Sequence, residues 1–135
     1  MTNWTPDDLD TLGGADEIEI TTLRPDGSAR RWTPIWSVRT GDDLYVRSYR
    51  GQAGAWYRRA RGGEPTRVRV RGHREHDVTV EVPGEVPGEA ATVVDQDAVD
   101  AAYRAKYARF GTTYLGPMVA PAARAATLRI TPLTA

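Results

Sequence analysis

The chain has 135 residues, 40% of them apolar and 27% charged, and its 18 basic and 18 acidic side chains balance to a formal net charge of zero. This composition is typical of one ordinary soluble domain, so we expect a single domain over residues 1–135. The absence of cysteine excludes disulfide scaffolds, thiolate nucleophiles and thiolate metal sites. No apolar run approaches the roughly 18 residues of a membrane span. The first residues also lack the pattern of a signal peptide, so we expect a cytoplasmic protein with no membrane partner.

The charges are sorted along the chain. Residues 1–20 carry six acids and no base, and residues 21–74 carry 13 arginines and four acids. Residues 75–100 carry eight acids and no base, and residues 101–135 carry five bases and no acid. Such blocks either fold against one another and cancel, or the basic middle binds an anion. Because nucleic-acid-binding domains are usually clearly basic, a pI near 6.7 predicts no nucleic-acid partner and favours a small anionic ligand.

The first half of the chain predicts one short helix and then mostly strands. Thr5 can cap the helix, Pro6 suits its first turn, and Gly13 and Gly14 end it. Polar and apolar residues alternate over residues 17–21, 67–71 and 77–82 and predict three strands, and two more strands are expected over residues 30–38 and 44–49. A second short helix is expected over residues 55–61, between the third and fourth of these strands.

The second half predicts more helix. A Val-Pro-Gly-Glu unit occurs twice in residues 82–89 and predicts an acidic surface loop. Apolar residues at helical spacing predict the longest helix over residues 97–110. A short helix over residues 121–126 and a sixth strand over residues 127–131 complete the expected order.

Short strands joined by tight turns favour a mainly β fold, an antiparallel small barrel, closed or half-open, with three or four short helices at its ends. An open α+β sheet is the alternative. Pro34 cannot donate a ladder hydrogen bond, so its strand must lie at an edge of the sheet or contain a bulge at that point.

The segment Arg47–Arg58 contains the residues that most clearly suit ligand binding. A strand ends in Ser48 and Arg50, passes through glycines and enters a helix. Free N–H groups at a helix start suit phosphate, and glycines let a ligand approach the backbone. An arginine can also clamp a phosphate through two hydrogen bonds. A plain connecting loop with solvated arginines is the alternative interpretation.

Two further groups converge on the same region. The turn at Gly41 places Arg31 and Thr33 level with the end of the next strand, so Arg30 and Arg31 either join a ligand site or form a charged edge that opposes aggregation. Aromatic side chains crowd this region and either wall a flat cofactor or belong to the core. They are Trp32, Trp36, Tyr49, Trp56 and Tyr57.

Catalytic side chains are not evident. With only two histidines in the chain, neither a metal site nor a histidine-based triad is expected. We therefore leave the catalytic residues unassigned and name Tyr49, Tyr57 and Tyr114 as the side chains to test. If the protein is an enzyme, a bound cofactor would supply the chemistry.

Three segments carry a resemblance to a known superfamily. They are the run Thr33-Pro34-Ile35-Trp36-Ser37-Val38, the run from Gly41 to Ser48, and Gly51 and Gly54 followed by Ala55-Trp56-Tyr57-Arg58. Together they resemble the flavin-binding split barrels. The chain is most similar to a small bacterial family of unknown function, common in actinobacteria, and more distantly to the deazaflavin-dependent nitroreductases. Residues 4–9 and 101–107 extend this resemblance over nearly the whole chain.

This resemblance implies a six-stranded split barrel, usually a homodimer, that binds flavin mononucleotide (FMN) or a deazaflavin coenzyme. It implies backbone contacts to the ring from Thr33, Pro34 and Ile35, and contacts beside the cofactor from Trp56 and Tyr57. The phosphate contacts that it implies come from Arg30, Arg31, Ser48, Arg50 and Gly51. With the two further aromatic residues of the region, the predicted cofactor-binding set is Arg30, Arg31, Thr33, Pro34, Ile35, Trp36, Ser48, Tyr49, Arg50, Gly51, Trp56 and Tyr57.

The leading hypothesis is a flavin- or deazaflavin-dependent oxidoreductase that acts on a small organic substrate. The alternative is a cofactor-free protein on the same barrel, either a small-ligand-binding module or a pathway accessory protein. A third hypothesis is an interaction protein that acts through its charged faces.

Overall fold

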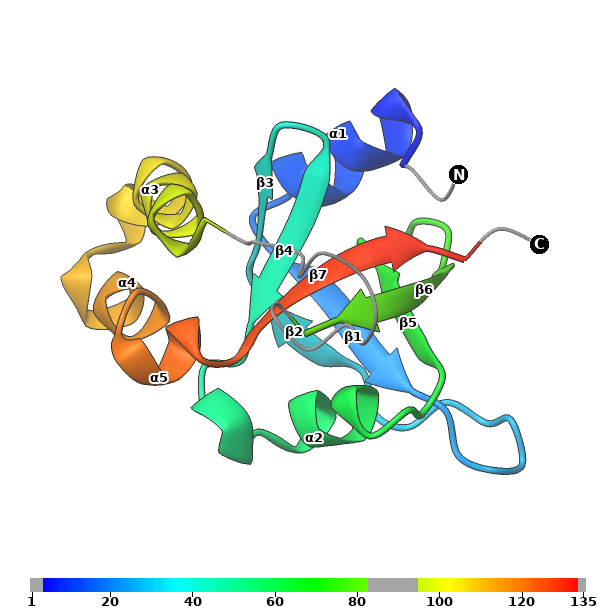
Figure 1. Ribbon diagram of the computed structural model, residues 1–135. Helices are drawn as coiled ribbons and strands as arrows, with labels where there is room; N and C mark the ends of the chain where they lie inside the picture. Colours follow the sequence, from blue (N-terminus) through cyan, green and yellow to red (C-terminus); the bar gives the residue numbers. More distant parts are fainter. Residues whose placement is uncertain (1–3, 83–94, 134–135) are drawn as a thin grey trace.

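The computed structural model describes residues 4–82 and 95–133, and the strands of these two ranges form one seven-stranded antiparallel sheet. The sheet curls into a nearly closed barrel (Figure 1), with the order β2-β1-β5-β6-β7-β4-β3. The strands are Ile18–Thr22 (β1), Thr33–Ile35 (β2), Ser37–Thr40 (β3), Asp43–Arg47 (β4), Thr66–Arg69 (β5), His76–Glu81 (β6) and Thr127–Pro132 (β7). The prediction of a mainly β, antiparallel barrel is therefore confirmed, and the open sheet is not observed.

Helices cover two ends and one side of this barrel (Figure 1). α1 (Pro6–Gly14) lies at one end and α2 (Ala55–Arg61) at the other. A layer of α3 (Gln96–Tyr107), α4 (Thr112–Met118) and α5 (Pro121–Arg124) packs along one side. Two short 3-10 turns are η1 (Gly51–Ala53) and η2 (Ala108–Phe110). Within the described ranges, no helix has the length and apolar character needed to cross a membrane.

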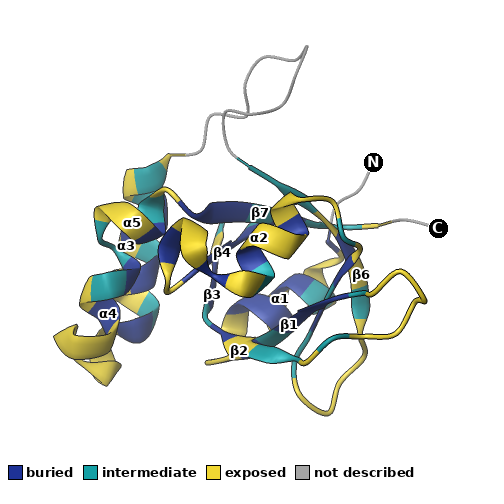
Figure 2. Ribbon diagram, turned by 90° about the horizontal axis from the view of Figure 1, so that it is seen from below, coloured by how far each residue is buried: buried dark blue, intermediate teal, exposed yellow. Residues whose placement is uncertain are grey.

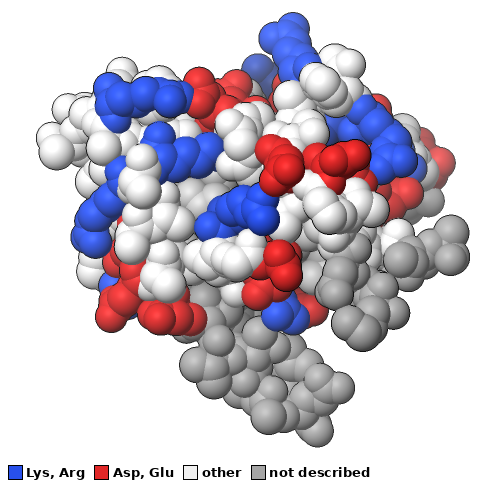
Figure 3. All heavy atoms as spheres, turned by 90° about the horizontal axis from the view of Figure 1, so that it is seen from above, with Lys and Arg blue, Asp and Glu red and all other residues white. Residues whose placement is uncertain are grey.

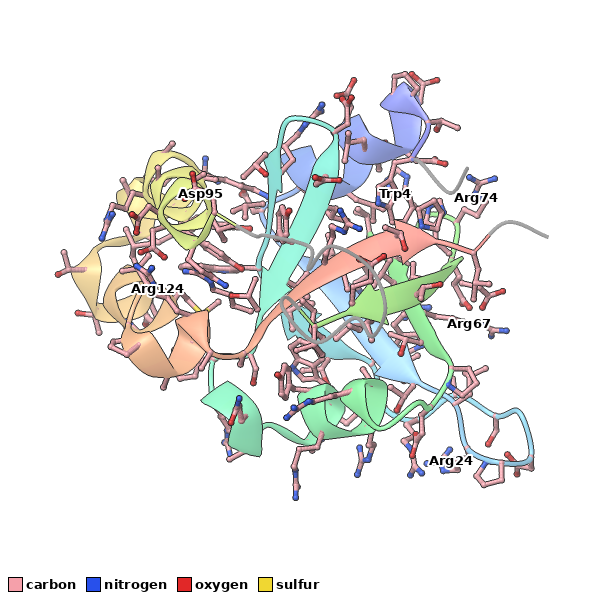
Figure 4. All side chains as sticks on the ribbon, viewed as in Figure 1. Trp4, Arg24, Arg67, Arg74, Asp95 and Arg124 are labelled. Carbon is pink, nitrogen blue, oxygen red and sulfur yellow. The ribbon has the colours of Figure 1, made fainter. Side chains whose placement is uncertain are left out.

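The start of α1 follows its predicted signals. The Thr5 hydroxyl accepts a hydrogen bond from the backbone N–H of Asp8, and Pro6 occupies the first turn. Trp4, just before the helix, donates from its indole Nε1 to the carbonyl of Ile130 at 2.8 Å (Figure 4). This bond fixes the first helix to the end of the barrel.

The prediction of one continuous strand over residues 30–38 is wrong. The segment divides at Trp36 into β2 and β3, which lie at the two edges of the sheet. β2 pairs with β1, with Ile35 opposite Ile18, whereas β3 pairs with β4, with Ser37 opposite Val46. Pro34 explains why β2 accepts an edge position, since proline has no N–H for a second neighbour. The barrel therefore has seven strands rather than six.

The helical layer also differs from the prediction. The sequence does not predict α4, because Gly116 and Pro117 have low helix propensity. The helix predicted to run to residue 110 ends as an α-helix at Tyr107 and continues as the turn η2. The described ranges thus hold five α-helices instead of three or four. The predicted acidic loop lies almost entirely outside the described residues.

Two apolar clusters form the core, and Figure 2 shows how the helices bury their barrel-facing sides. The first fills the barrel and includes Ile18, Ile20 and Leu128. The second lies between the barrel and the helical layer, where Val38 and Tyr45 pack with buried side chains of α3 and α4. The helical layer is therefore joined to the barrel by a core of its own.

The sorted charge blocks fold against one another in part. Figure 3 shows acidic and basic side chains side by side over the face seen from above. Ion pairs join distant segments of the chain: Arg39 to Asp10 at 2.6 Å, Arg69 to Glu19 at 2.9 Å, Arg67 to Asp77 at 2.6 Å and Arg129 to Glu81 at 2.5 Å. Much of the basic middle is therefore neutralised within the fold.

One half-buried cation, Lys106, predicts a pH dependence of stability. Lys106 donates from Nζ to the carbonyls of Gly13 at 2.7 Å and Ser37 at 2.6 Å. Burial lowers the pKa of Lys106 from 10.5 to about 8. Because the unfolded chain then holds this proton up to a higher pH than the folded chain, the Lys106 contribution to the free energy of unfolding should rise between about pH 8 and 10.5.

Urea unfolding of the wild type and of Lys106→Met, below and within this pH range, measures the effect. The difference between the two unfolding free energies should grow in favour of the wild type as the pH rises through the range. Two parallel pH profiles would contradict the assignment of this shift to Lys106.

Candidate functional site

A pocket of about 520 Å³ opens beside β2, where the barrel is interrupted. Its walls come from β1, from β2 and the segment before it, from the end of β4, and from the helices α2 and α4. The lining residues are Glu17, Thr21, Thr22, Arg30, Arg31, Thr33, Pro34, Ile35, Trp36, Arg47, Ser48, Tyr49, Arg50, Gly54, Ala55, Trp56, Arg59, Tyr114 and Met118. The volume falls within the range of roughly 300–1,000 Å³ common for small-molecule sites.

The change of strand partner at Trp36 creates this opening. Before Trp36, the chain pairs with β1, and after it the chain pairs with β4. The segment Ser48–Arg50, which follows β4, is therefore left without a strand partner opposite β2. Both sides of the resulting gap line the pocket.

The structure brings most of the predicted site residues together. Ten of the twelve line the pocket: Arg30, Arg31, Thr33, Pro34, Ile35, Trp36, Ser48, Tyr49, Arg50 and Trp56. The two arginine-bearing segments converge on the pocket as predicted. The predicted pairing that would bring them together is wrong, because Thr33 lies opposite Ile20 of β1 and not opposite the segment after β4. The contacts of these residues with a cofactor stay a prediction.

Gly51 and Tyr57 lie outside the lining. Gly51 adopts a positive φ of 64° and packs against Ala122, whose carbonyl oxygen lies 3.3 Å from the position a Cβ would take. Tyr57 belongs to the barrel core and is 1% exposed. Successive residues of a helix point about 100° apart, so Trp56 can face the pocket only if Tyr57 turns inward.

Three arginines of the lining keep their charge available. Arg31, Arg50 and Arg59 are exposed and form no ion pair with any residue in the described ranges. Arg30 differs, because it donates to both carboxylate oxygens of Glu64, at 2.9 and 3.2 Å. This hydrogen bonding holds the pKa of Glu64 below its ordinary value. Arg30 is therefore already engaged, and the three other arginines provide the positive charge of the pocket.

A buried hydroxyl lies at the base of this arginine-rich region. Ser48 is 1% exposed, and its Oγ has no hydrogen-bond partner among the described residues. Its backbone carbonyl accepts from the N–H of Gly51 at 2.9 Å, which closes the turn that carries Arg50. Since buried hydroxyls are nearly always paired, an unsatisfied one in the wall of a pocket suits contact with a polar ligand.

Aromatic rings form the apolar part of the wall. Trp36 stacks on Tyr107, with ring centroids 3.9 Å apart and an angle of 2° between the planes. The Tyr107 hydroxyl is held in turn by the backbone of Asp16 and Ser37. Tyr107 therefore covers one face of Trp36, and Phe110 lies near the same ring, with centroids 5.7 Å apart. Tyr49 and Tyr114, each 61% exposed, also line the pocket.

Sequence reasoning missed Arg47 as part of the site, along with Arg59 and Met118. Arg47 lines the pocket although it is only 1% exposed, and it forms an ion pair with Asp100 of α3 at 2.5 Å. Two signals could have indicated this pair: an arginine directly after the apolar run Leu44-Tyr45-Val46, and an aspartate three positions before the apolar Tyr103 in a predicted helix. Buried charges need partners of this kind.

Comparison with known proteins identifies the family. Residues 8–130 match the family described as "Uncharacterized protein conserved in bacteria (DUF2255)". The chain belongs to this family. The match confirms the predicted resemblance to a bacterial family of unknown function, and DUF2255 covers almost the whole barrel and the helical layer. No curated protein matches the chain.

Solved structures similar to this DUF2255 chain include a conserved hypothetical protein, Rv2991, from Mycobacterium tuberculosis. It is 12% identical, with a TM-score of 0.58 over 98% of this chain and 82% of that chain. This similarity supports the fold. An F420 reductase is 19% identical, with a TM-score of 0.49 over 97% of both chains. An FAD- and heme-binding protein from Mycobacterium smegmatis is 21% identical, with a TM-score of 0.44 over 94% of this chain and 65% of that chain.

Proposed function

We propose that the pocket binds FMN or a deazaflavin coenzyme and that the protein is an oxidoreductase acting on a small organic substrate. One observation carries the proposal: a single pocket combines aromatic walls with three arginines that have no ion-pair partner among the described residues. Such cofactors need both features, because they join a flat, largely apolar ring to a phosphate. The resemblance of residues 33–38 and 41–58 to flavin-binding split barrels supports the same choice.

The residues present fit the two parts of such a cofactor. The side chains of Trp36 and Trp56, both in the lining, provide flat apolar surface for the ring. Arg50 and the unsatisfied hydroxyl of Ser48 provide charged and polar donors for the phosphate, only two residues apart in the chain. Ser48 and Arg50 come from the turn after β4 and Trp56 from the helix that follows it, whereas Trp36 comes from the junction of β2 and β3.

The chain's own residues would then bind the cofactor and orient it. When bound, a flavin-type ring supplies hydride transfer. The arginines hold the anionic end, and the aromatic walls exclude water from one side of the ring. Tyr49 and Tyr114, both largely exposed in the wall, are the hydroxyl groups best placed to meet a substrate.

Removing Arg50 should weaken cofactor binding specifically. We expect Arg50→Ala to lose about 1.5–3 kcal/mol of binding free energy, the usual value for a hydrogen bond to a charged group. This corresponds to an affinity reduced roughly 10- to 150-fold. Calorimetric titration of the purified protein with FMN and, separately, with the deazaflavin coenzyme measures the change.

Arg58→Ala is the matched control, because Arg58 is exposed on α2 and does not line the pocket. Its affinity should equal that of the wild type. Unchanged affinity in Arg50→Ala would remove Arg50 from the site, and an equal loss in both variants would indicate general electrostatic attraction. If the wild type binds neither compound, the cofactor-free small-ligand protein becomes the better account of the pocket.

The predicted homodimer is a separate proposal. Light scattering of the purified protein would give twice the monomer mass if it holds, and the monomer mass would contradict it.

A further inference from the structure

Arg47 lines the pocket but has no donor left for a ligand. A guanidinium carries five N–H donors, and all five are used. Nε donates to Thr127 Oγ1 at 3.0 Å, and one Nη donates to Asp100 Oδ1 at 2.5 Å and to the carbonyl of Met118 at 2.9 Å. The other Nη donates to Oε1 of Gln96 at 2.7 Å and to its carbonyl at 3.4 Å. The role of Arg47 is therefore internal to the protein.

The partners of Arg47 join the barrel to every helix of the side layer. Arg47 ends β4 and Thr127 begins β7, whereas Asp100 lies on α3. The Met118 carbonyl closes α4, and Arg124 of α5 donates to the second oxygen of Asp100 at 2.7 Å. Arg124 lies between these helices in Figure 4. One guanidinium thus connects two strands with α3 and α4 directly, and with α5 through Asp100.

The junction formed by Arg47 with Thr127, Asp100, Gln96 and the Met118 carbonyl is continuous with the pocket wall. Arg47 directly precedes Ser48, and α4 supplies Tyr114 and Met118 to the lining. Met118 belongs both to the lining and to the helix end that Arg47 holds. A displacement of α4 would therefore move one wall of the pocket relative to the turn that carries Arg50.

We propose that Arg47 is a positioning residue for the pocket. Arg47 holds the end of α4 and the start of α3 against β4, and so sets the distance between the α4 wall and the turn after β4. This distance in turn determines the affinity for the ligand. The ligand part of this inference rests on the proposed function, whereas the placement of α4 does not.

Arg47→Lys tests the inference while keeping a positive charge beside Asp100. A lysine carries three donors on one nitrogen and cannot reproduce the planar fork that reaches α3, α4 and β7 together. Amide hydrogen exchange should become about tenfold faster or more in residues 112–118 and stay unchanged in β5 and β6. The affinity for the compound that the wild type binds, FMN or the deazaflavin coenzyme, should fall by about tenfold. Arg129→Lys is the matched control, because Arg129 pairs with Glu81 on the barrel and does not line the pocket.

Asp100→Asn serves as a second variant, because it weakens the same junction from the α3 side and keeps its shape. Unchanged exchange in residues 112–118 in both variants would overturn the inference, as would faster exchange with unchanged affinity for the compound that the wild type binds. Faster exchange over the whole barrel would show a general structural role and also overturn it. If the wild type binds neither FMN nor the deazaflavin coenzyme, the proposed function fails, and the exchange result alone decides whether Arg47 positions α4.

Discussion

Arg47→Met is expected to lower the free energy of unfolding by about 3–5 kcal/mol, the usual cost of breaking a buried ion pair from one side. The substitution leaves Asp100, with a side chain only 5% exposed, facing Arg124 alone. It also removes the donors to the Met118 carbonyl and to Gln96, which then lie buried or half-buried without those bonds. Urea denaturation of the wild type and the variant measures the difference.

An exposed ion pair provides the control for this prediction. Arg39 pairs with Asp10, and their side chains are 38% and 71% exposed. Arg39→Met should therefore cost less than about 1 kcal/mol. The double variant Arg47→Met/Asp100→Leu should recover part of the loss, because an apolar pair avoids the uncompensated charge. A cost below about 1 kcal/mol for Arg47→Met would contradict the central place of this junction in the fold.

Gly54→Ala should destabilise the turn that forms one wall of the pocket. A Cβ at this position would lie 2.3 Å from the Oγ of Ser48, which is itself buried. Ser48 or the start of α2 must therefore shift, and overpacking of this kind costs about 1–3 kcal/mol. We expect a matching decrease in the free energy of unfolding and weaker FMN binding, measured by urea denaturation and calorimetry.

The clash itself can be removed by a second substitution. Ser48→Ala deletes the hydroxyl that the new Cβ would meet, so the double variant Gly54→Ala/Ser48→Ala should regain most of the lost stability. Gly14→Ala is the control, because nothing lies within 4 Å of the position that a Cβ would take there. It should change stability by no more than about 0.5 kcal/mol. If the double variant is no more stable than Gly54→Ala, contact with Ser48 is not the cause.

Local patterns in the sequence were sufficient to predict most of the barrel. The capping residues of α1, the alternation in β5 and β6, and the edge or bulge required by Pro34 depend on neighbouring residues alone. Each agrees with the structure, in which the strand with Pro34 lies at an edge. The division at Trp36 could not be predicted in this way. The residue types of residues 30–38 suit a strand whether the chain pairs with one neighbour or transfers between two, so only the tertiary pairing shows the break.

In the candidate site, too, some features can be recognised from local sequence and others only from the tertiary structure. The segment around Ser48 and Arg50 is recognisable because glycines, a hydroxyl and arginines occur together in the sequence. Arg47 and Asp100 are 53 positions apart, and their pairing appears only when α3 packs on the barrel. The resemblance to split barrels places Tyr57 in the site together with Trp56, but adjacent helical residues face different directions. Periodicity along α2 could have separated the two, since Ala60, three residues beyond Tyr57, is also buried.

The most direct test of the proposed cofactor is tryptophan fluorescence of the purified wild-type protein titrated with FMN and, in a separate experiment, with the deazaflavin coenzyme. Two of the four tryptophans, Trp36 and Trp56, line the pocket and should be quenched by a ring bound there. We predict saturable quenching by one of the two compounds, and its loss in a variant that carries both Trp36→Phe and Trp56→Phe. The absence of saturable quenching by either compound would contradict the assignment of the pocket to a flavin-type cofactor.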